Sequence, residues 1–320
     1  MRERVETRDR VRRRVAAVTE PDRPRIVAVV VTFNRLGLLQ RLVGRLAEID
    51  RLDEVVVVDN ASTDGTGEWL SEQVVTFATL DRNRGGAGGF HEGMRRAVEG
   101  CGADLVWLMD DDGLPDTDCL DTLLAHQELD FWGPVVVDEA DPDRLVFPIR
   151  LPGGTRVVHD TDAVERSAVE GLVRDAVIPF NGVLVTRDLA VRIGYPREEF
   201  FIWGDDHEYR LRAERAGARI ATVAAARVRH PSVGELGTPM MRGRTTYNHS
   251  PSDLKHYCMA RNNLLNLREY RGWPHALAFV AKTLWFYTFT KSSPGRIGLS
   301  LRAMHAGLRG DFTGHVRYIR

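Results

Sequence analysis

The feature that most constrains the fold of this chain is an alternation of strand and helix patterns that begins near residue 25. Continuous β-branched runs are typical of buried parallel strands, and four occur in turn: RIVAVVVTF, DEVVVVDN, VVTFATL and ADLVWLMDDD. Segments with helical spacing, such as LGLLQRLVGRLAEI, separate them. Right-handed βαβ crossovers place the carboxyl ends of such strands on one edge of a sheet. We therefore expect an α/β fold with a mainly parallel sheet, flanked by helices, that binds ligands at that edge.

The second half of the chain has a less regular pattern. It predicts further strands, one of them ending at His230, and a helix capped by Thr186. Residues 160–175 are polar and residues 234–250 are rich in Gly, Thr and Met, so we interpret both as loops. Residues 260–263, with sequence ARNN, are expected to begin a helix near the ligand-binding edge. The arginine of this stretch could contact a diphosphate or could only cap the structure.

Composition and charge narrow the class of protein. The formal net charge of −1 argues against a nucleic-acid binder, and three cysteines without CxxC spacing favour a reducing cytoplasm over a disulfide framework. The N-terminus has no apolar signal region, and no apolar run approaches the roughly 20 residues that span a bilayer. Three parts are expected: an Arg-rich extension over 1–24, a catalytic domain over 25–268, and a basic, aromatic, helical segment over 269–320. We interpret the extension as a solvated helix, with a binding arm as the alternative.

Three consecutive acids, Asp110, Asp111 and Asp112, follow the fourth predicted strand. Because side chains alternate along an extended segment, Asp110 and Asp112 are expected on the same face. Neighbouring carboxylates repel unless a cation or solvent offsets their charge, and a hard divalent cation takes carboxylate and phosphate oxygens together. The triplet therefore indicates a site for a metal-bound diphosphate, with a solvated acidic turn as the alternative.

Polar residues and glycines follow the other three predicted strands at the same edge. Asp59 could accept hydrogen bonds from a base or a ribose, or could form a helix cap or an Asx-turn. The glycines could let the backbone approach a diphosphate at a helix N-terminus, or could form a flexible turn. The positions are, in chain order, Thr32, Phe33, Asn34 and Arg35, then Asp59 and Asn60, then Asn83, Arg84, Gly85, Gly86, Gly88 and Gly89.

A second acidic cluster lies in the segment WGDDHE, residues 203–208, at a predicted helix start. The helix dipole there favours carboxylates and is expected to keep them ionised. A capping role explains one acid but not the pair Asp205 and Asp206 together with a third acid. A carboxylate beside an aromatic such as Trp203 suits a general base that faces a sugar hydroxyl. His230, at a strand end, is a candidate metal ligand, although a single histidine is more often structural.

Taken together, these segments resemble the inverting family 2 glycosyltransferases of the GT-A fold. The resemblance covers residues 25 to 268 approximately and rests on VVVTFNR, VVVDNASTDGT, NRGGAGGF, MDDDG and WGDDHEYRLRAERAG, which stand in the family's order. Within the family, RNRGGAGGF, WGDDHEY, RH and ARNN look most like the actinobacterial galactofuranosyltransferases that start the cell-wall galactan. The resemblance implies a Rossmann-like domain with a mixed sheet. It also implies UDP-galactofuranose as donor and a polyprenyl-diphosphate-linked acceptor that ends in rhamnose.

The resemblance also assigns roles residue by residue. Asp110 and Asp112 match the DxD metal motif and His230 matches a third ligand, for Mn²⁺ or Mg²⁺. Asp206 matches the catalytic base, with Asp205 beside it in the catalytic pair. A single displacement with inversion follows, in which the base removes the proton of the acceptor hydroxyl. The residues expected to bind the nucleotide sugar are Thr32, Phe33, Asn34, Arg35, Asp59, Asn60, Asn83, Arg84, Gly85, Gly86, Gly88, Gly89, Asp110, Asp111 and Trp203.

The C-terminal segment bears on where the protein acts. Residues 275–289 are apolar and aromatic and have a basic flank, which suits peripheral contact with an anionic membrane surface. We therefore expect a cytoplasmic protein at the inner face of the cell membrane, with a lipid-linked glycan as its acceptor. The alternatives are a helix packed on the catalytic domain and a homodimer interface.

Three other functions remain open at this point. The first is transfer of rhamnose or another hexose by the same chemistry. The second is a nucleotidyltransferase, whose Gly-rich Lys/Arg signature is absent from the N-terminal part of this sequence. The third is an inactive sugar-nucleotide-binding protein, which does not account for the full set of acids.

Overall fold

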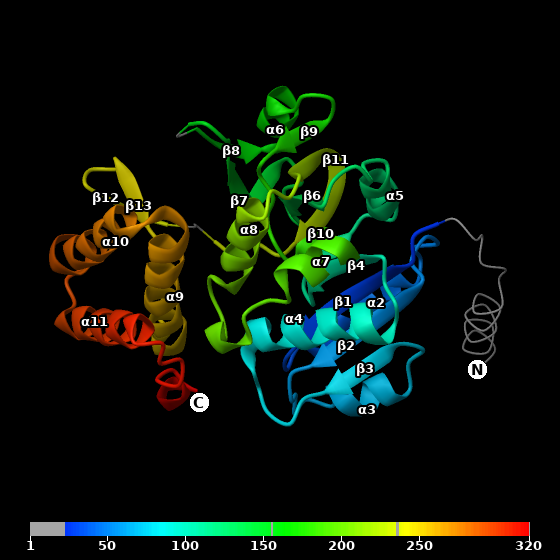
Figure 1. Ribbon diagram of the computed structural model, residues 1–320, viewed down its shortest axis with the longest axis horizontal. Coiled ribbons are helices and arrows are strands. Elements are labelled where there is room, and N and C mark those ends of the chain that lie inside the picture. Colours follow the sequence, from blue (N-terminus) through cyan, green and yellow to red (C-terminus); the bar gives the residue numbers. More distant parts are fainter. Residues whose placement is uncertain (1–22, 155, 235–236, 320) are drawn as a thin grey trace.

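A computed structural model describes residues 23–154, 156–234 and 237–319 (Figure 1). All but the last two residues of the predicted N-terminal extension, 1–24, lie outside the described residues.

The centre of the fold is a sheet of 11 strands. The strands are β1 (Ile26–Thr32), β2 (Glu54–Asp59), β3 (Thr76–Thr79), β4 (Leu105–Asp110), β5 (Leu114–Pro115), β6 (Phe131–Asp138), β7 (Arg144–Arg150), β8 (Val157–Asp160), β9 (Leu172–Arg174), β10 (Asn181–Thr186) and β11 (Ile220–His230). The central path has the order β3-β2-β1-β4-β10-β6-β11-β5, while β7, β8 and β9 branch from it. Along this path β3, β2, β1, β4, β6 and β11 run in one direction, whereas β10 and β5 run in the opposite direction. The predicted mixed, mainly parallel sheet is therefore confirmed.

Helices cover both faces of this sheet because every residue of β1 is buried and successive side chains point to opposite faces. Ile26, Ala28 and Val30 share one core cluster with leucines of α2 (Leu36–Leu46), α3 (Thr66–Ser71) and α5 (Cys119–Leu124). Val27, Val29 and Val31 share the other with α4 (Gly85–Arg95), α7 (Arg187–Ile193) and α8 (Asp205–Arg215). The uninterrupted apolar pattern of the first run thus follows from burial on both faces.

The second half confirms the strand expected to end at His230, which is β11, and the helix capped by Thr186, and it corrects other expectations. Thr186 caps α7, since its side chain accepts a hydrogen bond from the backbone N–H of Leu189. Residues 160–175, expected as a loop, contain α6 (Thr161–Ser167) and β9, because Val164 and Val173 enter an apolar cluster with β7. Residues 234–250 likewise contain a hairpin, β12 (Thr238–Met240) and β13 (Thr245–Tyr247). Short apolar contacts therefore order segments whose composition is polar.

Three helices follow at the C-terminus and form a block beside the sheet (Figure 1). They are α9 (Asp253–Arg271), α10 (Trp273–Trp285) and α11 (Pro294–Leu308), and a π-helical turn, η3 (Phe286–Thr290), continues α10. Ala260 and Leu264 of α9 pack with Leu299 and Ala303 of α11 in one cluster. The helix α9 runs through the domain boundary expected at residue 268. Among the described helices, none combines the length and apolar character needed to cross a membrane.

Candidate active site

The carboxyl ends of β1, β2 and β4 meet at one edge of the sheet, as the strand pattern predicts. Register pairs Thr32 of β1 with Asp59 of β2, and Val31 of β1 with Asp110 of β4. The first two strand ends are joined further, because the backbone N–H of Asn60 donates to the carbonyl of Thr32 at 2.9 Å. Side chains from these three strand ends therefore face a common region.

The acidic triplet leaves the strand at its first member. Because β4 ends at Asp110 and the next two residues form a turn, the extended alternation expected of the triplet stops at Asp110, although the charge of Asp112 still acts on Asp110. Asp111 turns into the protein, where the Thr32 hydroxyl donates to it at 2.7 Å and Arg35 at 3.1 Å. Arg35 also donates to Asp112 at 2.8 Å. One guanidinium thus bridges the second and third acids.

Asp112 has a second cationic neighbour in His230, the last residue of β11. Its carboxylate lies 3.1 Å from Nε2 of His230. The other ring nitrogen, Nδ1, lies 2.7 Å from the carbonyl of Pro231, and Phe147 contacts the ring edge-on. Burial alone would raise the pKa of Asp112, but contact with His230 and Arg35 lowers it below the ordinary value. These two contacts therefore favour the ionised form of Asp112.

The pKa of Asp110 is shifted in the opposite direction. Burial raises its pKa to about 8, and the negative charges of Asp112 and Asp111 add to the effect. Like charges held together at this depth are a costly arrangement unless a cation neutralises them. Asp110 therefore has the electrostatic environment of a carboxylate that a bound cation would stabilise.

The predicted metal ligands Asp110, Asp112 and His230 are partly assembled. Asp112 and His230 are in contact, and the charges of Asp110 and His230 affect each other's pKa. Among the residues that the structure describes, however, no three His, Cys, Asp or Glu side chains are arranged as a metal site. Two carboxylates and an imidazole are ligands that Mn²⁺ accepts, so the donor set fits a divalent cation in its chemistry.

The loops that follow β1 and β2 are joined through Asn34, and Asp59 orders the second of them. The side-chain oxygen of Asn34 accepts a hydrogen bond from the backbone N–H of Thr63 at 2.7 Å. The backbone N–H of Asn34 donates to the Ser62 hydroxyl at 2.9 Å. Asp59 uses Oδ1 to accept from the N–H of Ser62, which is the Asx-turn alternative. Its buried Oδ2 has no hydrogen-bond partner among the described residues. Phe33, 40% exposed, offers an aromatic face at the same edge.

Asn60 and Asn83 shape the loop that enters α4. The side chain of Asn60 donates to the carbonyl of Gly85 at 2.7 Å and accepts from the N–H of Arg84 at 2.8 Å. Asn83 accepts from the N–H of Gly85 at 2.8 Å. The Arg84 guanidinium pairs with Glu198. These side chains, expected to bind the nucleotide sugar, are engaged in holding the loop.

The glycine-rich stretch is the first part of α4 rather than a flexible turn before it. A Cβ on Gly89 would overlap Val31 of β1, and one on Gly88 would lie 2.5 Å from Cβ of Arg84. Gly85 has a φ of +71° and would overlap the carbonyl of Phe201. By contrast, a Cβ on Gly86 would meet no described atom within 4 Å. Close packing therefore explains three of the four glycines that were expected to line a diphosphate.

The segment that carries the second acidic cluster has a strained backbone. Phe201 and Trp203 have φ of 66° and 67°, and Gly204 has φ of 86°, immediately before α8 begins at Asp205. Non-glycine residues rarely adopt such values, so the surrounding structure must hold them there. The strain turns the chain sharply and sets the acidic pair at the helix N-terminus.

The acidic pair lies in a buried setting. Burial raises the pKa of Asp205 well above the ordinary value, and the charges of Asp206 and Asp110 add to it. Burial also raises the pKa of Asp206, against hydrogen bonds from the backbone at His207 and Gly204. Desolvation therefore outweighs the helix dipole and raises the pKa of both acids, whereas the dipole alone would lower it. The influence of Asp110 on Asp205 also brings together the two acidic clusters, which are distant in sequence.

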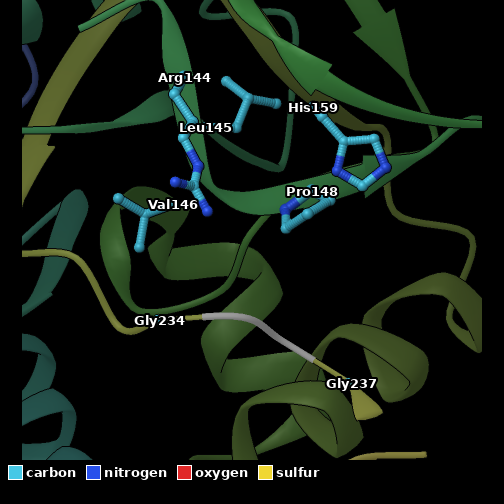
Figure 2. Close-up of a pocket in the computed structure, with 7 residues that line it drawn as sticks. All are labelled: Arg144, Leu145, Val146, Pro148, His159, Gly234 and Gly237. Atoms are coloured by element: carbon cyan, nitrogen blue, oxygen red, sulfur yellow. The ribbon is translucent and has the colours of Figure 1, made fainter. Parts of the chain in front are cut away.

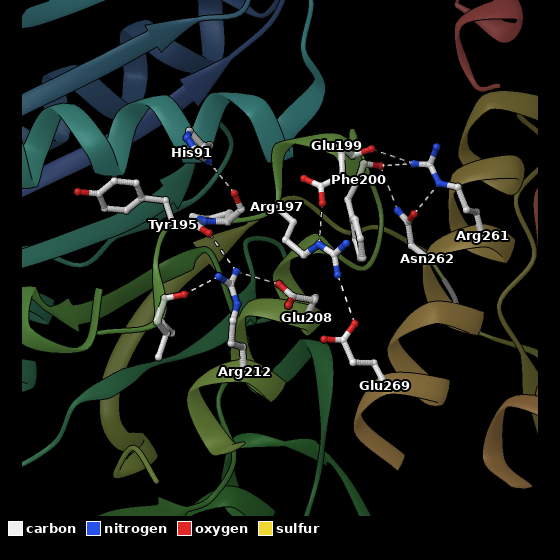
Figure 3. Close-up of polar contacts among 12 residues, drawn as sticks. His91, Tyr195, Arg197, Glu199, Phe200, Glu208, Arg212, Arg261, Asn262 and Glu269 are labelled. Carbon is white, nitrogen blue, oxygen red and sulfur yellow. Dashed lines mark hydrogen bonds and ion pairs between the residues drawn. The ribbon is translucent and has the colours of Figure 1, made fainter. Parts of the chain in front are cut away.

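Polar side chains of α9 hold the strained segment in place (Figure 3). The side-chain nitrogen of Asn262 lies 3.0, 3.2 and 2.7 Å from the carbonyl oxygens of Phe200, Ile202 and Trp203. Asn266 donates to the carbonyl of Gly204 at 2.8 Å. The guanidinium of Arg261, fully buried, donates to the carbonyl of Phe200 at 2.8 Å.

Arg261, Asn262 and Asn266 together form a clamp on this segment, and their position corrects the interpretation of ARNN. The stretch lies inside α9 and does not begin a helix. Sequence analysis missed Asn262 and Asn266 as a pair, although amides four residues apart share a helix face and so signal a common partner. The buried Arg261 binds backbone carbonyls instead of the diphosphate or a helix cap.

A second set of polar contacts joins α8 and the segment before it to α9; Figure 3 shows Glu208 with Arg212 and Arg197 with Glu269. Glu208, buried in the first turn of α8, accepts from the Tyr270 hydroxyl at 2.5 Å and from Arg212 at 2.9 Å. Arg197 pairs with Glu269 at 3.3 Å. The helix that carries the acidic pair is therefore fixed to the C-terminal block by side chains as well as by packing.

Comparisons with known proteins agree with this architecture. Residues 27–148 match the family described as Glycosyl transferase family 2. The chain is 35% identical over 245 residues to "Galactofuranosyltransferase GlfT1" of Mycolicibacterium smegmatis, an alignment that covers 74% of this chain and 81% of the relative. It is 32% identical over 307 residues to the protein of the same name from Mycobacterium tuberculosis, covering 90% and 96%.

The fold is similar to that of a solved structure, the mannosyltransferase PcManGT from Pyrobaculum calidifontis in complex with GDP-Man and Mn²⁺. The TM-score is 0.52 and the sequence identity is 18%. The match covers 93% of this chain and 92% of that one. At this identity the likeness supports the fold of the sheet and its helices.

Proposed function

Because this chain belongs to glycosyltransferase family 2, we propose that it transfers galactofuranose from UDP-galactofuranose to a polyprenyl-diphosphate-linked acceptor that ends in rhamnose, in cell-wall galactan synthesis. The GlfT1 relatives, aligned over most of both chains, support this choice of sugar. The observation that carries the proposal is this alignment over most of both chains, together with the strand-end cluster in which Asp112 lies 3.1 Å from His230.

The donor binds at the edge formed by β1, β2 and β4. The exposed ring of Phe33 and the unpartnered Oδ2 of Asp59 support a nucleotide site, since a base can stack on one and hydrogen-bond to the other. Arg35, half exposed between two acids, is a donor for diphosphate oxygens. Trp203, beside the acidic pair, faces the sugar.

The reaction is a single displacement at the anomeric carbon. Asp206, less buried than Asp205, removes the proton of the acceptor hydroxyl, and that oxygen attacks the anomeric carbon as its bond to the diphosphate breaks. UDP leaves, and the configuration inverts because only one displacement occurs. The charge of Asp206 raises the pKa of Asp205, so the two carboxyl groups titrate as a pair.

A divalent cation held by Asp110, Asp112 and His230 would supply positive charge that stabilises the departing diphosphate. The raised pKa of Asp110 and the mixed carboxylate–imidazole donor set support this assignment. The charge of His230 already offsets part of the acidic cluster in the protein alone.

The C-terminal helices contact the inner surface of the cell membrane in this proposal, as a unit that starts at Asp253. Exposed apolar side chains on α10 and its extension support the contact, because such side chains insert among lipid headgroups. They are Trp273, Leu277, Trp285 and Phe289, with exposures of 53%, 60%, 43% and 69%. Contact through the same surface with a second copy of the chain is the alternative.

One assay tests the proposal. The purified protein is given a synthetic rhamnose-terminated lipid diphosphate and, separately, UDP-galactofuranose, UDP-galactopyranose and dTDP-rhamnose, with Mn²⁺ or Mg²⁺ or with chelator. We expect transfer from UDP-galactofuranose that chelator abolishes. Turnover with dTDP-rhamnose alone would replace the proposal by rhamnosyl transfer, and release of nucleotide monophosphate coupled to diphosphate would indicate a nucleotidyltransferase. Binding of UDP without any turnover would indicate an inactive sugar-nucleotide-binding protein.

A further inference from the structure

A cavity of about 530 Å³ lies between the β7–β8 hairpin and the C-terminal block. Its size is within the range of small-molecule sites. The lining residues are Pro148, Arg150, Val157, His159, Thr246, Tyr247, Asn248, Met259, Asn263, Phe279 and Lys282. A smaller cavity of about 350 Å³ adjoins it and shares Pro148 and His159, whose side chains stand together on the hairpin in Figure 2.

The charged side chains among the described lining residues are of one sign. Arg150 of β7 and Lys282 of α10 line the cavity, and none of the described lining residues is acidic. Burial lowers the pKa of Lys282, and the positive charge of Arg150 lowers it further. An anionic group in this space would accept charge-assisted hydrogen bonds from both side chains. Thr246, Asn248 and Asn263 add neutral hydrogen-bonding groups.

The cavity adjoins the base-bearing loop. Asn263 lies on its wall, and the side-chain oxygen of Asn263 is 3.7 Å from where a Cβ on Gly204 would stand. Trp203 packs against the cluster that contains Tyr247 and Met259, two more lining residues. No described lining residue comes from β1 to β4, where the donor is proposed to bind. The cavity therefore stands on the acceptor side of Asp206.

The wall of the same cavity also has an apolar part. Phe279 of α10 contributes to it, and Met259 and Tyr247 add further apolar area. The exposed Leu277 lies on another face of α10, because residues two apart in a helix point to different sides. A ligand that joins an anionic group to a hydrocarbon chain matches this combination of cationic and apolar side chains in one cavity.

We propose that this cavity binds the diphosphate of the prenyl-linked acceptor, with Arg150 and Lys282 as the cationic contacts. The inference rests on the proposed function, which requires a lipid diphosphate beside Asp206. The prenyl chain runs from the cavity along α10, and the sugars extend past Asn263 toward the acidic pair.

Direct binding provides the first test. Farnesyl diphosphate is titrated by calorimetry into the protein with saturating UDP, so that the donor site is filled. We expect Arg150→Gln and Lys282→Gln each to weaken binding about tenfold or more, because each removes a charge-assisted hydrogen bond. Lys255→Gln, a matched change at an exposed lysine outside the cavity, should bind as the unaltered protein does. Equal affinity in all four proteins would overturn the proposal.

A phospholipid headgroup presents similar phosphate chemistry, so dihexanoylphosphatidylglycerol is titrated in the same way. Affinity for it equal to that for farnesyl diphosphate would overturn the assignment to a diphosphate. Kinetics supply the second test, as the ratio of kcat/KM for a lipid diphosphate acceptor to that for an octyl glycoside of the same sugars. The ratio should fall about tenfold or more in Lys282→Gln, and an unchanged ratio would contradict the proposal. If no acceptor is glycosylated by any variant, the proposed function fails, while the binding experiment still decides the role of the cavity.

Discussion

Replacing Asn262 by alanine tests whether α9 holds the base-bearing loop in its working conformation. The amide is fully buried and reaches the carbonyl oxygens of Phe200, Ile202 and Trp203. Because an amide nitrogen carries two N–H donors, at most two of these three carbonyls accept a full hydrogen bond at one time. Each buried carbonyl left without a donor costs about 1–3 kcal/mol. The carbonyl of Phe200 keeps its hydrogen bond from Arg261, so the losses fall on the carbonyls of Ile202 and Trp203 and amount to roughly 2–6 kcal/mol, before any relaxation of the loop.

Relaxation lowers that cost and moves the acids. Phe201 and Trp203 have positive φ, and each stores about 1–3 kcal/mol of strain that a looser loop releases. We therefore expect Asn262→Ala to lower the global stability by about 2–4 kcal/mol. The loop should drift from its position, and a displacement of about 1 Å at a catalytic group costs on the order of a hundredfold in rate.

Kinetics and UDP binding together distinguish a displaced loop from a loss of the folded site. Steady-state kinetics should give a kcat reduced on the order of a hundredfold, while titration of UDP gives a Kd within threefold of the unaltered value. Asn266→Ala removes one of two hydrogen bonds to the carbonyl of Gly204, since the backbone N–H of Glu208 also donates to it, and is a graded control with a smaller loss of kcat. A kcat within twofold of the unaltered value in folded Asn262→Ala would refute the clamp. Parallel loss of UDP binding would show that the whole site, not the loop alone, depends on Asn262.

Three further predictions concern pH, packing and the membrane surface. Burial raises the pKa of Asp206, and a base must be ionised to act, so kcat/KM should fall as pH decreases through a value above 3.8; a limb at or below that value would contradict the assignment. Gly89→Ala should lose about 1–3 kcal/mol in chemical denaturation, because the new methyl overlaps Val31, whereas Gly86→Ala, in open space, should not lose stability; equal results would contradict the packing role. Phe289→Ser should reduce sedimentation with anionic vesicles, whereas Val191→Ser, at a similarly exposed residue of α7, should not; an equal effect of both would argue against a membrane-facing α10.

Periodicity in the sequence predicts the sheet and the edge at which the site forms. Every residue of β1 is apolar up to Val31, so the pattern states that both faces are buried, and the strand-to-helix alternation then fixes where carboxyl ends meet. Thr32, Asp59 and Asp110 stand together for that reason. The Thr186 cap is likewise local, since a hydroxyl and an N–H three residues later decide it.

Contacts between distant segments account for what sequence reasoning missed. Asn262 recognises carbonyls about 60 residues earlier, and no local pattern specifies that pairing. The pKa values of Asp205 and Asp206 depend on burial by segments that are distant in the sequence. The helix dipole, which is local, therefore predicted a lowered pKa where burial raises it. Gly89 is the exception, because small residues on the inner face of a helix could have indicated close approach to a strand.

The central claim is that Asp206 is the base of a galactofuranosyl transfer. The most direct measurement is transfer of labelled galactofuranose from UDP-galactofuranose to the rhamnose-terminated lipid acceptor by the unaltered protein and by Asp206→Asn, with UDP binding measured on both. The account predicts transfer by the first, a loss of at least about a hundredfold in the second, and equal UDP binding. Undiminished transfer by Asp206→Asn, or no transfer of galactofuranose by the unaltered protein, would contradict it.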